Sequence, residues 1–166
     1  MTSLRVGAAH ETLARAACFW TARTGALPDW ADDPAGDVRA RYTANCFREL
    51  DSFLRELLDA IAPTPQPQQR NTANRLGAQL ARDRIEASGD PARLRAIGRS
   101  SACLFHCAGW VRRPDQAAGE WMTAGWSDAA GNGLRRYRLG DRLRPGPDEV
   151  AEVCRFFLRV GETVRA

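Results

Sequence analysis

The sequence predicts an all-α fold: a helical bundle of about five helices, with a small β-hairpin or ordered loop inserted before the last helix. Apolar residues recur every three or four positions in several segments, which is the pattern of amphipathic helices. Clusters of glycine, proline and aspartate separate these segments. One stretch, residues 119–147, instead combines tryptophans, a Gly-Asn-Gly turn and apolar residues that alternate with polar ones.

The first two helices are expected at about residues 2–23 and 37–61. The first is rich in alanine and is followed by the helix breakers Gly25 and Pro28. The second has the strongest amphipathic pattern in the chain, made by Val38, Tyr42, Cys46, Leu50, Phe53, Leu57 and Ile61. We interpret the charges on its other side as a solvated face with helical ion pairs; they are Arg41, Arg48, Glu49, Arg55 and Glu56.

A third, more weakly patterned helix is expected at about residues 70–87, and the last helix at about 148–164. Before the third helix, the alternate prolines from Pro63 onward favour polyproline geometry, so we expect a short exposed loop there rather than a linker between domains. The chain contains no internal repeat, and we interpret residues 1–166 as a single domain.

Composition and charge narrow the functional classes. The chain is 44% hydrophobic and 27% charged, which is typical of a globular protein. No apolar run is long enough to cross a bilayer, and the N-terminus lacks the apolar core of a signal peptide, so we expect a cytoplasmic protein. Five cysteines without disulfide-scaffold spacing fit free thiols in a reducing compartment. All 24 basic residues are arginines, and the net charge of +4 favours an anionic partner.

The fourth helix, expected from about residue 90 to residue 113, carries the functional prediction. Asp90 suits its N-cap, Pro91 suits its first helical position, and Pro114 stops it. At about 100° per residue, one side of this helix collects the residues expected to face the core. They are Leu94, Ile97, Ser101, Leu104, Phe105, Ala108 and Val111.

The opposite side of this helix has an unusual composition. Within about 40° of one another it collects Arg99, Cys103, His106 and Trp110. A cation, a thiol, an imidazole and an indole do not resemble a solvated face. We therefore expect this side to be a second covered surface, either a cleft or a subunit contact, with Cys103 and Trp110 as part of its wall.

The spacing of Arg99 and His106 fits chemistry on a phosphodiester. They are seven positions apart, which places them two helical turns, or about 10 Å, apart along one stripe. Histidine can take and give protons near neutral pH, and arginine can stabilise the charge that develops on phosphorus. RNA supplies its own nucleophile, the 2′-hydroxyl, so this chemistry needs no metal cofactor.

The string Arg99-Ser-Ser-Ala-Cys-Leu-Phe-His106 resembles the signature of the HEPN superfamily, in which an arginine and a histidine with four to six residues between them lie on a late helix of a small α-bundle. The resemblance covers chiefly residues 37–113 and the last helix. It implies that Arg99 and His106 are catalytic residues of an endoribonuclease. It also implies a homodimer whose two signatures share a cleft and cut RNA without metal, in a toxin–antitoxin or antiphage defence setting.

The chain also departs from the family pattern. Ser100 follows the arginine where the family often has Asn, Asp or His, and Ala108 stands where one subgroup has a tyrosine that a partner enzyme modifies with a nucleotide. The hairpin-like insert is not part of the common core. For RNA binding we assign Ser100 together with the arginines along the helix, which could grip flanking phosphates; these are Arg95, Arg112 and Arg113.

Three other hypotheses compete with RNA cleavage. Cys103, His106 and Cys107 could supply three zinc ligands, but no fourth ligand is evident, and we expect no metal site. Cys103 could be a nucleophile beside His106, but no carboxylate orients that pair. A different class of function is a non-catalytic dimerisation or adaptor module of a larger defence or signalling system, with an antitoxin or effector protein as partner.

Overall fold

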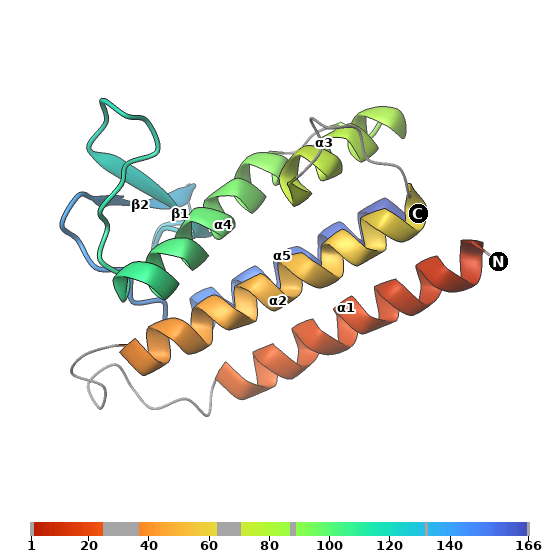
Figure 1. Cartoon of the computed structure of the whole chain (residues 1–166), viewed down its shortest axis with the longest axis horizontal. Coiled ribbons are helices and arrows are strands. Elements are labelled where there is room, and N and C mark those ends of the chain that lie inside the picture. Colours follow the sequence, from red (N-terminus) through yellow and green to blue (C-terminus); the bar gives the residue numbers. More distant parts are fainter. Residues whose placement is uncertain (1, 25–36, 63–70, 87–88, 132, 166) are drawn as a thin grey trace.

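The computed structural model describes residues 2–24, 37–62, 71–86, 89–131 and 133–165. Its elements, in chain order, are α1 (Thr2–Thr24), α2 (Asp37–Ile61), α3 (Thr72–Arg82), α4 (Asp90–Cys107), β1 (Trp121–Ser127), β2 (Leu134–Arg138) and α5 (Pro147–Arg165) (Figure 1). The prediction of a mainly helical bundle with a small hairpin before the last helix is confirmed. The expected proline loop lies outside the described residues.

The helices form a bundle around α2. On one side, α1 packs along α2 and α5, and on another side α2 contacts α4, which in turn carries α3 (Figure 1). Within the apolar stripe of α2, Cys46, Leu50 and Leu57 are completely buried, whereas Val38 at the start of the helix is 76% exposed. Gly161 lets α5 approach α1 closely, because a Cβ atom at this position would lie 2.9 Å from Leu13 Cδ2. No described helix has the length and apolar character needed to cross a membrane.

The end of α4 differs from the prediction. The helix ends at Cys107 rather than near residue 113, because Ala108 and Gly109 both adopt positive φ angles, of 50° and 85°. A Cβ atom at Gly109 would lie 2.6 Å from the carbonyl oxygen of Leu143, so this position has no room for a side chain. The chain then pairs with a distant segment, where Val111 N donates to Asp141 O at 2.9 Å.

The third helix is shorter than predicted. Asn71 caps its N-terminus, where the side-chain oxygen accepts a hydrogen bond from Asn74 N at 2.8 Å. At the other end, Arg84 has a positive φ of 56°, and Ile85 N bonds back to Leu80 O at 3.0 Å, which closes the helix. These local bonds account for a helix that is confined to the middle of the predicted range.

The hairpin lies on α4. Strands β1 and β2 pair antiparallel and flank the predicted turn, of which residue 132 lies outside the described residues. The inner face buries Met122, Trp126 and Tyr137. Gly125 permits the contact with α4, since a Cβ atom there would lie 2.8 Å from the Cα atom of Ile97. The hairpin is therefore part of the core and not an appended loop.

Candidate functional site

Two sides of α4 are covered within the chain. Ile97, Ser101 and Leu104 face α2, and the Ser101 hydroxyl donates to Ala44 O at 3.1 Å. A second buried side, with Ala96, Ser100 and Cys103, faces the hairpin and the segment that leads to it. The remaining stripe carries Arg95, Arg99, Ala102 and His106, of which Arg99 is half-buried and the others are exposed. The two predicted catalytic residues therefore share one accessible stripe.

Ser100 lies in the interior and not on this stripe. Its side chain is fully buried, and its hydroxyl oxygen accepts a hydrogen bond from Gly125 N at 3.2 Å. The hydroxyl thus attaches β1 to α4, and the structure does not bring it to a surface where RNA could reach it. The assignment of Ser100 to RNA binding does not fit this placement, and the reason is that the hairpin covers that side of the helix.

Cys103 also packs beneath the segment that follows α4. Its side chain is 8% exposed, and its thiol donates to the carbonyl oxygen of Trp110 at 3.3 Å. Burial, with a smaller contribution from Cys107, raises the pKa of the Cys103 thiol to about 12. A thiol of this kind is not a ready nucleophile near neutral pH. The cover that we expected from a cleft or second subunit is thus supplied, at Cys103, by the chain itself.

Arg99 is held by a carboxylate from the loop before β1. Its Nε atom lies 2.8 Å from Asp115 Oδ1, and its side chain is 39% exposed. The other oxygen, Asp115 Oδ2, accepts hydrogen bonds from the backbone and the hydroxyl of Thr123, at 3.0 and 2.5 Å. Asp115 therefore links the exposed stripe of α4 to strand β1.

His106 lies in the last turn of α4, beside the first turns of α2. It lines a cavity of about 270 Å³, together with Asp37, Arg41, Phe105, Cys107, Ala108, Trp110 and Arg112. Trp110 is 44% exposed, and the guanidinium of Arg142 lies over its ring at 5.3 Å. Of the predicted site residues, the fold thus brings together His106, Trp110 and Arg112. Arg113 is exposed and lines neither this cavity nor the two described next.

A row of arginines on α2 faces the stripe of α4, and the sequence analysis missed its role. Arg41, Arg48 and Arg55 follow one another at seven-residue intervals, so they lie about 10.5 Å apart on one side of the helix. Because α2 and α4 run in opposite directions, Arg41 lies near His106, whereas Arg55 lies near the start of α4. The seven-residue spacing was the signal that could have revealed this row.

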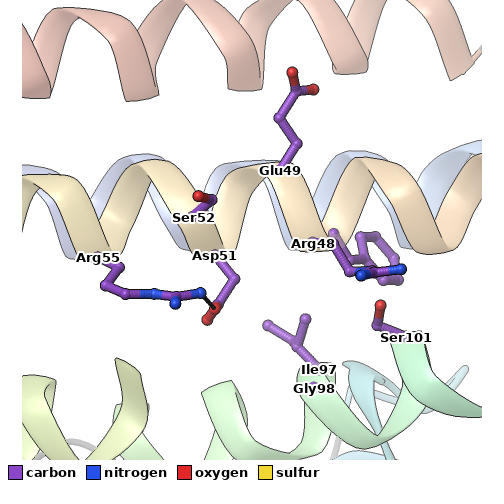
Figure 2. Close-up of a pocket in the computed structure, with 9 residues that line it drawn as sticks. Arg48, Glu49, Asp51, Ser52, Arg55, Ile97, Gly98 and Ser101 are labelled. Atoms are coloured by element: carbon purple, nitrogen blue, oxygen red, sulfur yellow. Dashed lines mark hydrogen bonds and ion pairs between the residues drawn. The ribbon is translucent and has the colours of Figure 1, made fainter. Parts of the chain in front are cut away.

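Two further cavities connect this row with α4. One, of about 410 Å³, lies between Arg48, Ser52 and Ser101 (Figure 2). The other, of about 580 Å³, is lined by Arg55, Asn71, Arg95, Arg99 and other residues of α3 and α4. Both cavities share Asp51, Arg55 and Gly98. The cavity at His106 shares no lining residue with these two, and we refer to the three cavities together as the α2–α4 groove.

Cations outnumber carboxylates along the α2–α4 groove. Asp51 is already bound, because it accepts hydrogen bonds from Thr72 at 2.9 Å and from Arg55 at 3.3 Å. Glu49 points away from α4 toward α1 in Figure 2, where it accepts a hydrogen bond from the indole of Trp20. The cations of the groove are Arg41, Arg48, Arg55, Arg95, Arg99 and Arg112.

Several of these guanidinium groups remain available to an anion. In the described part of the chain, no carboxylate lies at ion-pairing distance from Arg41, Arg48 or Arg112. Arg48 instead lies over the Phe105 ring at 4.7 Å. A planar guanidinium without a carboxylate can grip a phosphate through two hydrogen bonds. The groove is thus suited to an extended polyanion.

The same region offers no evident metal site. Among the described residues, no group of three His, Cys, Asp or Glu side chains is placed to hold a metal ion. Cys103 points into the interior whereas His106 is exposed, so the ligand set considered from the sequence does not gather at one point. The ionisable groups that line the groove include its guanidinium groups, the imidazole of His106 and the carboxylates of Asp37, Glu49 and Asp51.

Comparison with known proteins found no match, either among protein-family models or among curated proteins and solved structures.

Proposed function

We propose that this protein is a metal-independent endoribonuclease of HEPN type that acts as a homodimer in a toxin–antitoxin or antiphage defence setting inside the cell. One observation carries the proposal. Arg99 and His106 lie on the same accessible stripe of α4, along a groove whose arginines are largely without carboxylate partners. A single-stranded RNA backbone matches this groove in charge and in extended shape.

The proposed reaction uses the 2′-hydroxyl of RNA as nucleophile. His106 removes the proton of this hydroxyl, or protonates the leaving 5′-oxygen, and its counterpart in the second protomer takes the other role. The bond from the 2′-oxygen to phosphorus forms while the bond from phosphorus to the 5′-oxygen breaks. The products carry a 2′,3′-cyclic phosphate and a 5′-hydroxyl, and no water, metal or redox partner is consumed.

Arg99 is proposed to hold the scissile phosphate. Its ion pair with Asp115 involves Nε, so the two terminal nitrogens can bind phosphate oxygens while the carboxylate fixes the side chain. Near His106, the arginines at positions 41 and 112 can hold neighbouring phosphates. In this scheme the charge along the groove positions the RNA, and the contacts at the scissile phosphate lower the barrier.

A dimer is part of this proposal because Arg99 and His106 lie apart within one protomer. Within one protomer, Arg99 lines the 580 Å³ cavity and His106 lines the 270 Å³ cavity, so they do not share a single enclosed site. Two copies that meet through the stripe of α4 would place Arg99 of one protomer near His106 of the other. Isologous contacts of this kind are the commonest route to a symmetric dimer.

The test is cleavage of a labelled RNA by the purified full chain in excess EDTA. We expect cleavage with a 2′,3′-cyclic phosphate product, and no cleavage of the same oligonucleotide with 2′-deoxyribose at the cut site. Arg99→Lys should lose most activity because an ammonium group cannot reproduce the two-pronged contact, whereas Arg5→Lys, at an exposed position on α1 outside the groove, should keep it. Cleavage that needs a divalent metal, or full activity of Arg99→Lys, would overturn the proposal.

A second candidate function is a non-catalytic dimerisation or adaptor module that docks onto an antitoxin or effector protein. The observation that favours it is the Arg99–Asp115 ion pair, because this contact can be purely structural. An RNA cleavage assay on the purified dimer distinguishes the two functions. An adaptor keeps its dimer and shows no RNA cleavage, whether or not Arg99 and His106 are replaced.

A further inference from the structure

The outward face of the β-hairpin carries an arrangement that the proposed chemistry does not use. Trp121 pairs directly with Arg138 across the strands, and Thr123 pairs with Arg136. Their neighbours Met122 and Tyr137 point into the core, so these four side chains share the opposite face. We call Trp121, Thr123, Arg136 and Arg138 the hairpin platform.

Two guanidinium groups flank one indole on the hairpin platform. The Cζ atom of Arg138 lies 4.9 Å from the centroid of the Trp121 ring, and that of Arg136 lies 5.1 Å from it. Both arginines are exposed, and in the described part of the chain neither has a carboxylate at ion-pairing distance. The ring holds the two cations beside it, and both side chains remain exposed to solvent.

The surrounding segment concentrates the positive charge of the protein. Residues 108–146 contain seven arginines and four acidic residues, whereas the whole chain has a net charge of only +4. Three of these four carboxylates are engaged by the hairpin region itself. Asp115 binds Thr123, Asp128 accepts from Ala130 N at 3.1 Å, and Asp141 accepts from Arg138 N at 2.7 Å. These bonds fix the positions of the carboxylates, and the segment as a whole stays positive, with seven arginines against four acidic residues.

The platform continues the α2–α4 groove. Asp115 contacts Arg99 of the groove with one oxygen and Thr123 of the platform with the other. A strand of RNA that leaves the groove at Arg99 therefore meets the platform next, without crossing an acidic barrier at Asp115, because that charge is neutralised. Single-stranded bases stack on aromatic rings and on arginine planes, and a two-stranded sheet face with both is suited to them.

We propose that the hairpin platform binds single-stranded RNA, with bases stacked on Trp121 and its flanking guanidinium groups and with phosphates held by Arg136 and Arg138. This inference rests on the proposed function, because it takes RNA as the substrate. Its test measures RNA binding and not RNA cleavage. It assigns the insert before α5 the role of a substrate-binding element.

The experiment measures binding of a fluorescent, unstructured 12-nucleotide RNA (about the site size of single-strand binding folds) by anisotropy. The full chain carries His106→Ala throughout, so that the RNA stays intact. Arg136→Gln with Arg138→Gln is compared with a control of equal charge change on α1, Arg5→Gln with Arg23→Gln, where both arginines are exposed. Trp121→Ala is a third variant, and thermal unfolding checks that each protein is folded.

We expect the platform double variant and Trp121→Ala each to lose on the order of 10-fold in affinity, the scale of one stacked base. The dependence of log affinity on log salt should fall by roughly two for the platform double variant, one for each phosphate contact removed. The affinity of the α1 double variant should stay within about twofold of that of the parent protein. This small change reflects only the general loss of two positive charges. A duplex of the same sequence should compete poorly.

Two outcomes would overturn the inference: equal affinity of the platform and α1 double variants, or no RNA binding at low salt, which would leave the platform to a protein partner. Its failure is distinguishable from failure of the proposed function. If the unsubstituted chain binds RNA through the platform but never cuts it, the inference stands and the catalytic proposal fails. If the unsubstituted chain cuts RNA while the platform variants bind RNA normally, the catalytic proposal stands and the inference about the platform fails.

Discussion

Asp115 joins Arg99 to Thr123, and through this contact the accessible stripe of α4 is coupled to the hairpin. The carboxylate lies 2.8 Å from Arg99 Nε, and it accepts two hydrogen bonds from Thr123. The contact between Arg99 Nε and Asp115 is an ion pair without hydrogen-bond geometry, and it draws the Arg99 side chain toward the segment before β1. The insert before the last helix thereby positions a residue that the proposed reaction needs.

Asp115→Asn tests this positioning. The amide keeps an oxygen for Thr123 but removes the charge that holds Arg99, so we expect kcat for RNA cleavage to fall by about 10-fold or more while KM changes little. Asp141→Asn is the matched control, because Asp141 also accepts a backbone hydrogen bond in the hairpin region but contacts no groove residue in the described structure. An equal loss in both variants would show that Asp115 matters only for the fold of the hairpin.

His106→Ala tests the proton-transfer role. We expect cleavage to slow by on the order of 100-fold or more, the usual scale for loss of a general acid–base group, with the dimer unchanged in sedimentation. His10→Ala is the control, because His10 is the other histidine of the chain and lies on α1, near Arg165. Normal cleavage by His106→Ala would remove this residue from the mechanism.

Gly125→Ala tests the close contact between the hairpin and α4. A Cβ atom at Gly125 would meet the backbone of Ile97, so we expect a loss of about 1–3 kcal/mol in the free energy of unfolding, measured with urea. Gly98→Ala on α4 is the control. No atom lies within 4 Å of the added Cβ there, and we expect a gain of about 0.5–1 kcal/mol from helix propensity. Unchanged stability of Gly125→Ala would contradict the described packing.

The lowered pKa of the Glu152 carboxyl on α5 predicts how the free energy of unfolding depends on pH. Burial raises the pKa of its carboxyl, but hydrogen bonds from Ser127 and the charge of Arg93 outweigh burial and hold this pKa below its ordinary value. A carboxylate whose folded-state pKa is depressed stabilises the fold above its unfolded-state pKa. That contribution is lost as the pH falls through the folded-state pKa, which lies below about 4.3, the ordinary value.

We therefore expect Glu152→Gln to be less stable than the unsubstituted protein at neutral pH, and the difference to shrink below about pH 4. The measurement is the urea midpoint at several pH values. Glu162→Gln, an exposed position on the same helix, is the control. A constant difference between Glu152→Gln and the unsubstituted protein at all pH values would show that the carboxylate charge is not what stabilises this contact.

Much of the fold was present in local sequence patterns. The apolar periodicity of residues 37–61 predicted helix α2 to its last residue, and the glycine-rich turn predicted a hairpin or an ordered loop where the structure has a hairpin. The side of α4 that carries Ile97 and Leu104 was also predicted correctly. Each of these features depends on neighbours within a few positions along the chain, so the pattern alone determines them.

Other features depended on residues far apart in the sequence. Helix α4 ends where Ala108 and Gly109 adopt positive φ angles, and Gly109 packs against the distant Leu143 backbone. Ser100 is buried because the hairpin, whose Gly125 N donates to it, covers that side of the helix. The charged side of α2 is exposed, as the sequence pattern predicted, but the pattern did not show that antiparallel packing on α4 makes its arginines one wall of a groove. Helical periodicity determines which side of a helix is apolar. Which polar side faces another element is decided only when the tertiary structure brings distant segments together.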